Sequence, residues 1–227
     1  MGNQKTKSVS RAQLDGNSLI NVTIDNLVRA IVDGDFLPGQ RLVIAELAKR
    51  FDVGPMPVRQ ALLRLEGEGL VEASPNRGAV VRRVDAEMVG NIYEVRLCLE
   101  TLLVTKCVAE ITSSDISAIS SIQREYEAEI AGGYNDNAFQ LNREFHYHIN
   151  RLGNNAEALV ILERGSRLIA ALRARYGFSA TRLEDVSNEH RALINALRQG
   201  DEKDAASIIR MHTTAARKDM LKRMENS

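Results

Sequence analysis

The sequence predicts a mainly α-helical protein in which a winged helix-turn-helix domain precedes an all-helical bundle of about six helices. Two observations lead to this prediction. Apolar residues recur at intervals of three and four along most of the 227 residues, which is the periodicity of amphipathic helices. The exception is one short β-rich stretch around a turn, between residues 70 and 84.

The winged domain is expected over residues 18–84. Apolar spacing predicts a helix over 18–32, which the glycines and proline of DGDFLPGQRL end. A short helix, VIAELAKRF, follows, and a third helix begins in DVGPMPVRQALLRLEGEGL. The runs LVEAS and AVVRRV flank a Pro-Asn-Arg-Gly turn and are typical of a β-hairpin. Three helices followed by a two-stranded wing are the outline of a winged helix-turn-helix.

The entrance of the third helix carries Gly54, Pro55 and Pro57. Gly54 occupies the expected N-cap, and Pro55 falls at the first helical position, where its missing N–H would have no partner. Pro57 is tolerated because it lies inside the first turn. The prolines therefore fix where the helix begins. In helix-turn-helix proteins the first turns of the second motif helix enter the DNA major groove.

The side chains near this entrance suit base recognition. Arg59 can fork onto a guanine edge, Gln60 can pair with adenine or contact a phosphate, and Met56 can touch a thymine methyl group. The alternative is an ordinary solvated helix face. The candidate DNA-binding residues are Met56, Arg59, Gln60 and Arg64 on the helix and Asn76 and Arg77 at the wing tip, with Arg82 and Arg83 following.

The charge distribution agrees with a phosphate-binding front half. Up to Val84 the chain has 12 Lys and Arg against 9 Asp and Glu, and from Asp85 onward it has 18 against 21, although the formal net charge is zero.

The motifs FLPGQRL, ELAKRF-DVG, PVRQALLRLEGEGLV and PNRGAVV, in this order, resemble the DNA-binding domain of the GntR superfamily of bacterial transcription regulators. The resemblance covers residues 18–84 and implies that Arg59 contacts bases of the operator DNA. This chain has Gly54-Pro55 where the family usually has Ser-Arg. The base contact that this family arginine usually makes is therefore not expected in this chain.

Residues 85–227 are expected to form the second, all-helical domain, with no strand. Helical periodicity continues to about Met224, and each break carries helix start and stop residues. The expected N-caps are Ser114 or Asp115, Asn135 or Asp136, Asn155, Thr181 and Asp201.

Three of the four histidines interrupt apolar stripes of three different helices. They are His146, His190 and His212, and Asn142 lies one turn before His146 on the same face. Each could be a hydrogen-bonded core histidine. Alternatively, one metal ion could satisfy all three imidazoles together. Three histidines with an oxygen donor suit Zn²⁺, Ni²⁺ or another first-row divalent ion.

Arg96 interrupts the apolar stripe of the first long helix. An inward arginine beside a cation would favour an anionic guest such as a carboxylate. An ion pair between Arg96 and Glu100 on the surface is the competing interpretation.

The motifs YEVRLCLE, LNREFHYHI, GNN, EHRALINAL and AASIIRMH resemble the FCD effector domain of the FadR-like branch of the same superfamily, over residues 85–220. The resemblance implies that Asn142, His146, His190 and His212 hold a divalent metal, zinc or nickel before others. It also implies that Arg96 contacts a small organic acid. Asp is commoner than Asn at the first ligand position.

The leading hypothesis is that the protein is a transcription regulator, with a repressor favoured over an activator. It would bind a short inverted repeat of double-stranded DNA as a homodimer and respond to an organic acid. The alternatives are a metal-dependent hydrolase or lyase acting on a small carboxylate, and a purely structural metal. No apolar run reaches the roughly 20 residues of a membrane span, so a cytoplasmic protein is expected. Residues 1–17 are expected to form a disordered arm, and Cys98 and Cys107 to be reduced core thiols.

Overall fold

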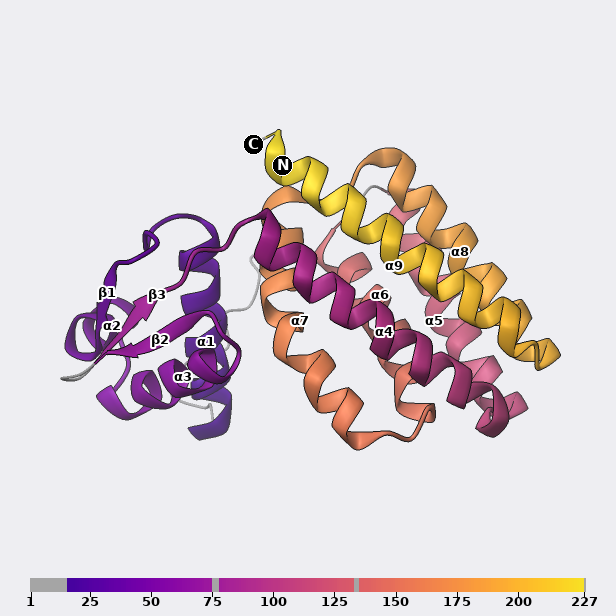
Figure 1. Ribbon diagram of the computed structural model, residues 1–227, viewed down its shortest axis with the longest axis horizontal. Coiled ribbons are helices and arrows are strands. Elements are labelled where there is room, and N and C mark those ends of the chain that lie inside the picture. Colours follow the sequence, from indigo (N-terminus) through magenta and orange to yellow (C-terminus); the bar gives the residue numbers. More distant parts are fainter. Residues whose placement is uncertain (1–15, 75–77, 133–134, 227) are drawn as a thin grey trace, which may run out of the picture. The chain divides into compact units, whose positions relative to one another are not determined.

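The computed structural model describes residues 16–74, 78–132 and 135–226, and these form nine helices and three strands. The chain divides into two compact units, of which the first ends at Val84 and the second begins at Asp85 (Figure 1). Most of the expected N-terminal arm, residues 1–15, lies outside the described residues, and helix α1 begins at Gly16.

The first unit contains the three expected helices, α1 (Gly16–Val32), α2 (Ile44–Phe51) and α3 (Pro55–Gly67). Their apolar stripes face one another, because side chains from all three are almost completely inaccessible to solvent. The most buried are Ile24 and Leu27 of α1, Leu47 of α2, and Val58, Ala61 and Leu65 of α3. This small core holds α3 in place and leaves its opposite side free.

The sheet of the first unit has three strands, one more than expected. They are β1 (Arg41–Val43), β2 (Val71–Ser74) and β3 (Gly78–Val81), in the antiparallel order β1-β3-β2. The hairpin of β2 and β3 is the predicted wing. Strand β1 was missed because three residues are too few to display the alternation of a strand, and its structure comes from pairing with the edge of β3. A Cβ at Gly78 would lie 2.3 Å from the carbonyl oxygen of Leu42, so this pairing needs glycine there.

The second unit consists of six helices in its described part, as predicted, with no strand. They are α4 (Ala86–Glu110), α5 (Ser113–Ala131), α6 (Asp136–Leu152), α7 (Ala156–Tyr176), α8 (Ala180–Gln199) and α9 (Glu202–Glu225). Among the described residues, no helix is long and apolar enough to cross a membrane.

Three of the expected N-caps are confirmed, since the side chains of Asn135, Asn155 and Asp201 each accept a backbone hydrogen bond three residues ahead. Two were wrong. Helix α5 is capped by Thr112, with Asp115 completing a capping box three residues later. Helix α8 is capped by Ser179 in place of Thr181. In both cases the expected residue lies inside the first turn, and the cap is the hydroxyl residue directly before the helix.

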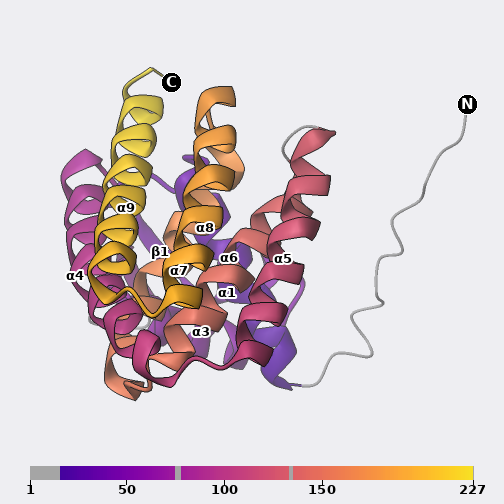
Figure 2. The same ribbon diagram turned by 90° about the vertical axis from the view of Figure 1, so that its right-hand side faces the viewer.

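Helices α4 and α9 lie side by side in both views of the ribbon (Figures 1 and 2) and run antiparallel. Arg217 of α9 bonds Glu94 near the start of α4, and Thr213 bonds Glu100 one to two turns further on. The main core cluster draws apolar residues from α4, α5, α6, α8 and α9.

The two cysteines differ in exposure. Cys107 belongs to this core, where burial raises the pKa of its thiol to about 12, whereas Cys98 is exposed. Only one of the two is therefore a core thiol.

Candidate DNA-binding surface and metal centre

The entrance of α3 has the predicted geometry. Gly54 is the N-cap in an extended conformation, with φ −67° and ψ 162°, and Pro55 occupies the first helical position. The preceding helix, α2, ends at Asp52, which adopts a left-handed conformation with φ 52°. The turn between α2 and α3 is thus defined by backbone conformation at both ends.

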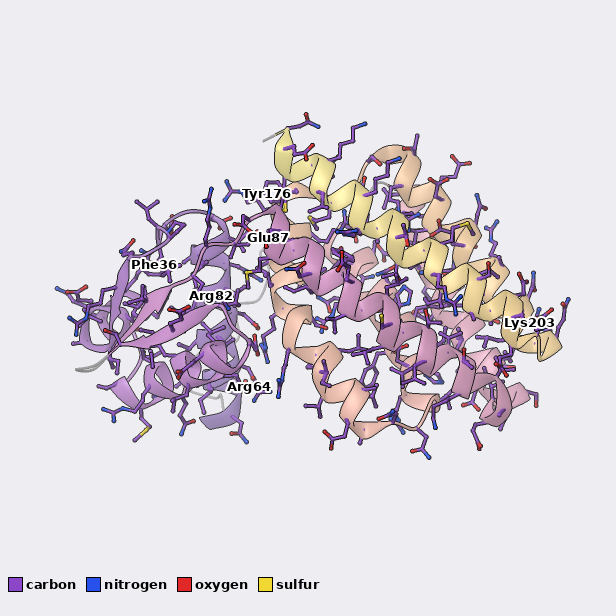
Figure 3. The ribbon with its side chains drawn as sticks, in the orientation of Figure 1. Phe36, Arg64, Arg82, Glu87, Tyr176 and Lys203 are labelled. Atoms are coloured by element: carbon purple, nitrogen blue, oxygen red, sulfur yellow. The ribbon has the colours of Figure 1, made fainter. Side chains whose placement is uncertain are left out.

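One face of α3 is turned to solvent. Met56 is 62 % exposed, and Arg59, Gln60 and Arg64 are also exposed; Figure 3 labels Arg64. The side chains of Arg59 and Gln60 make no hydrogen bond or ion pair with any residue in the described ranges. All four helix candidates are consequently accessible to a partner.

The wing is described only in part. Asn76 and Arg77, the candidates at its tip, lie outside the described residues. Arg82, just after the wing (Figure 3), donates from Nη1 to the carbonyl oxygen of Gly69 at 2.9 Å and lies 3.5 Å from Glu72. Arg82 therefore ties the end of β3 to the segment after α3.

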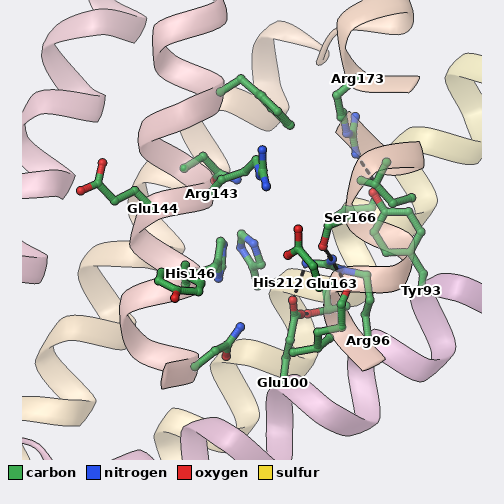
Figure 4. A pocket seen from close by; sticks show the side chains of 18 of the residues that line it. Tyr93, Arg96, Glu100, Arg143, Glu144, His146, Glu163, Ser166, Arg173 and His212 are labelled. Carbon is green, nitrogen blue, oxygen red and sulfur yellow. Dashed lines mark hydrogen bonds and ion pairs between the residues drawn. The ribbon is translucent and has the colours of Figure 1, made fainter. Parts of the chain in front are cut away.

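In the second unit, His146 of α6, His190 of α8 and His212 of α9 come together. One ring nitrogen of each lies within 4.8 Å of the others, and the Nε2 atoms of His146 and His190 are 3.2 Å apart. His190 and His212 are buried, and His146 is partly buried. Figure 4 shows His146 and His212 beside a cavity.

Two of these imidazoles are oriented by acceptors behind them. Nδ1 of His190 lies 2.7 Å from Oε1 of Gln123, whose amide donates to Glu127 at 2.7 Å. Nδ1 of His212 lies 2.7 Å from a carboxylate oxygen of Glu189. Because both partners accept, each Nδ1 carries the hydrogen and each Nε2 keeps its lone pair for another ligand.

Burial keeps the three imidazoles neutral. It lowers the pKa of His146 to about 4 and holds the pKa values of His190 and His212 well below the ordinary range. Nearby cationic arginines, Arg182 among them, act in the same direction. A neutral imidazole is the form that binds a metal ion.

The residues present fit a divalent cation. At metal–nitrogen distances of about 2.0–2.1 Å, tetrahedral ligands are about 3.3 Å apart, close to the 3.2 Å between the first two Nε2 atoms. Asn142 lies one turn before His146 and lines the same cavity, and its side-chain amide makes no hydrogen bond within the described part of the chain.

The cavity beside the histidines has a volume of about 720 Å³. Its walls come from α4, α6, α7, α8 and α9. Arg96 lies in this wall, and its Nη2 is 2.5 Å from Glu100, which is 3 % exposed and also accepts from Thr213. The Arg96–Glu100 ion pair is therefore present, but it is largely buried and borders the cavity.

Several groups at this site were not foreseen from the sequence. Gln123 and Glu189 orient the histidines, and buried Arg182 bonds both Glu189 and the backbone oxygen of His212. Glu189 is next to His190 in the sequence, but its side chain contacts His212 on the following helix. The fourth histidine, His148, lies outside the cluster, with its Nε2 3.7 Å from a carboxylate oxygen of Asp115 on α5. One signal was available in the sequence for Gln123, which interrupts the apolar stripe Ile116, Ile119, Tyr126 and Ile130 of α5.

Two family models match the chain. The model for bacterial regulatory proteins of the gntR family matches residues 19–81, and the FCD domain model matches residues 91–215. The chain therefore belongs to the GntR family of DNA-binding transcription regulators, in the branch that carries an FCD domain. Proteins of this kind are regulators and not enzymes, so the hydrolase or lyase alternative is not supported.

Individual relatives agree with this assignment. The chain is 28 % identical over 189 residues to the HTH-type transcriptional regulator YdhC of Bacillus subtilis, covering 83 % of this chain and 84 % of YdhC. It is 24 % identical over 190 residues to the HTH-type transcriptional repressor RspR of Escherichia coli, covering 83 % of each. The structure of E. coli McbR/YncC is similar in fold, with a TM-score of 0.72 at 20 % identity, over 91 % of this chain and 99 % of that one.

Proposed function

We propose that this regulator is a repressor that binds a short inverted repeat as a homodimer through α3, and that a small organic acid bound beside a divalent metal releases it. We place this activity in the cytoplasm, where the bacterial operator lies. The observation that carries the proposal is the histidine cluster, which borders a cavity of about 720 Å³ in the effector domain of a DNA-binding protein.

The DNA-binding part of the proposal rests on the exposed face of α3. Arg59, Gln60 and Met56 occupy its first two turns and are free to meet base edges. A two-fold symmetric dimer would present two such helices to two half-sites. The name of RspR, a repressor, supports the sense of regulation.

The sensing part rests on the second unit. His146, His190 and His212 would hold zinc or nickel with Asn142 as the oxygen donor, and the metal would supply a Lewis-acidic position for an anion. Arg96 would contact the organic acid through the donors that Glu100 and Ser166 do not fully occupy.

The test is operator affinity measured with and without organic acids. An operator is selected from random-sequence DNA with the full-length protein, and we expect an inverted repeat with two protomers per duplex. A bound acid should weaken operator binding by up to about 100-fold, the scale of a coupling energy of about 1–3 kcal/mol. If acids leave both operator affinity and thermal melting unchanged, the metal is structural and the sensing part of the proposal is wrong.

A further inference from the structure

The polar groups that border the cavity differ in whether they already have partners. Arg96 is paired with Glu100, Arg182 with Glu189, and Arg173 with Asp219. Arg173 also donates to the backbone oxygens of Gly177 and Ala216. The charges of these three arginines are therefore compensated within the protein.

Arg143 is different. It lines the cavity from α6, three residues before His146, and its guanidinium has no hydrogen bond or ion pair with any described residue. Figure 4 shows its guanidinium extending into the cavity, whereas the side chain of the next residue, Glu144, points away. Arg143 is thus an uncompensated cation positioned to bind an anionic group in a fork.

Asn150 is a second group without a partner, and it is buried. It lies one turn after His146 on the cavity side of α6 and is 7 % exposed, and its side-chain amide makes no hydrogen bond with any described residue. Water in the cavity can satisfy its amide. A guest that fills the cavity displaces that water, and it binds well only if it supplies the hydrogen bond itself, because a buried amide left unpaired is unfavourable.

Glu163 completes the set from the opposite wall. It belongs to α7, lines the cavity, and has no partner among the residues that the structure describes. An unpaired carboxylate accepts hydrogen bonds from hydroxyl groups and repels a second carboxylate. The cavity therefore has an anion-binding side at Arg143 and a side that favours hydroxyl groups at Glu163.

From this arrangement we propose that the effector is a polyhydroxylated carboxylic acid, bound by Arg143 at its carboxylate and by Asn150 and Glu163 at its hydroxyl groups. This inference rests on the proposed function and selects one class of acid. A fatty acid would leave Asn150 and Glu163 unpaired, and a dicarboxylate would place charge against Glu163. Apolar side chains such as Phe139 and Leu162, which also line the cavity, contact the C–H faces of the carbon chain.

The test compares acids of equal length on the metal-loaded, full-length protein. Calorimetry is carried out with the aldonates gluconate, galactonate and mannonate, with hexanoate, which lacks the hydroxyl groups, and with the dicarboxylate adipate. We expect at least one aldonate to bind at least about 100-fold more tightly than hexanoate and adipate, because sites built for hydroxyl groups strongly reject analogues without them.

Variants assign the contacts. Asn150→Leu should weaken aldonate binding at least about tenfold and leave hexanoate unaffected, and Arg143→Gln should weaken every acid. Arg151→Gln and Glu144→Gln, on the same helix, are the matched controls. Arg151 does not line the cavity, and the side chain of Glu144 points away from it, so neither change should alter the affinity for any acid. Metal content, measured separately, should be the same in all four variants.

Preferential binding of hexanoate or adipate that also releases the operator would overturn this inference and leave the proposed function standing. Absence of binding by all five acids, in protein that holds metal and binds the selected DNA, would overturn it too. If Arg143→Gln and Arg151→Gln weaken acid binding equally, Arg143 is not part of the effector site.

Discussion

The two units position their functional side chains in opposite ways. In the first unit, the candidate DNA contacts Met56, Arg59 and Gln60 follow one another on a single helix, and the core behind α3 only has to hold that helix. In the second unit, the three histidines come from three helices, and each imidazole is placed by packing of the whole bundle. A surface built on one helix tolerates single substitutions structurally, whereas a site assembled from several helices depends on every contributor.

Loss of one histidine should have the largest effect. His212→Ala removes a proposed metal ligand and the Nδ1 group that bonds Glu189, whereas the Arg182–Glu189 ion pair and the bond from Arg182 to the backbone oxygen of residue 212 remain. We expect metal binding to fall by more than the 10–100-fold that is typical of outer-shell changes, measured as metal per protomer by elemental analysis. His148→Ala, outside the cluster, is the control. Full metal retention in His212→Ala would contradict the proposed centre.

In the first unit the largest effect is expected at Arg59. Arg59→Ala should weaken operator binding by about 1–3 kcal/mol and relax one base position, without loss of thermal stability, because the side chain is exposed and unpaired. Titration of selected and base-substituted operators measures both quantities. Unchanged specific binding would show that α3 does not read the DNA. Arg29→Ala, on the exposed side of α1, serves as a control for general charge loss.

A positioning residue sharpens the comparison further. Gln123→Ala should lower metal affinity about 10–100-fold, because His190 loses the acceptor that fixes its Nδ1 hydrogen. Gln123→Glu keeps an acceptor at this position and should restore part of the affinity, although its carboxylate would face Glu127. Metal titration with a competing chelator separates these values. Equal affinity in Gln123→Ala and the unmodified protein would mean that packing alone orients His190.

The smallest expected change is at the N-cap of α3. Gly54→Ser introduces a hydroxyl that can accept from the N–H of Met56, since Pro57 has no N–H to donate, and it should stabilise the first unit by a few tenths of a kcal/mol. Chemical denaturation measures the change. No contact restricts the substitution, since the nearest atom to an added Cβ is Cδ of Pro57 at 3.8 Å. A destabilisation of 1 kcal/mol or more would show that the glycine backbone itself is required.

The sequence was informative where structure is local. The start of α3 at Pro55, three of the five loop N-caps and the apolar faces of the helices follow from residues close together in the chain. The meeting of the histidines was also expected, because each interrupts an inward stripe. Strand β1 and the contacts of Gln123 and Glu189 could not be predicted from the sequence, since they depend on which distant segment packs nearby. The roles proposed for Arg143 and Asn150 could not be predicted either, because a side chain that lacks a partner produces no pattern in the sequence.

Pro55 and Pro57 have a consequence for the unbound protein. Each proline ring restricts the backbone of the disordered chain, so the segment that leads into α3 has less conformational entropy to lose when it folds. The same restriction matters when the helix binds DNA, because a segment that is already ordered loses less conformational entropy on association. We therefore expect association with DNA to proceed without a slow ordering step at this turn, so that differences between operators arise mainly in the dissociation rate.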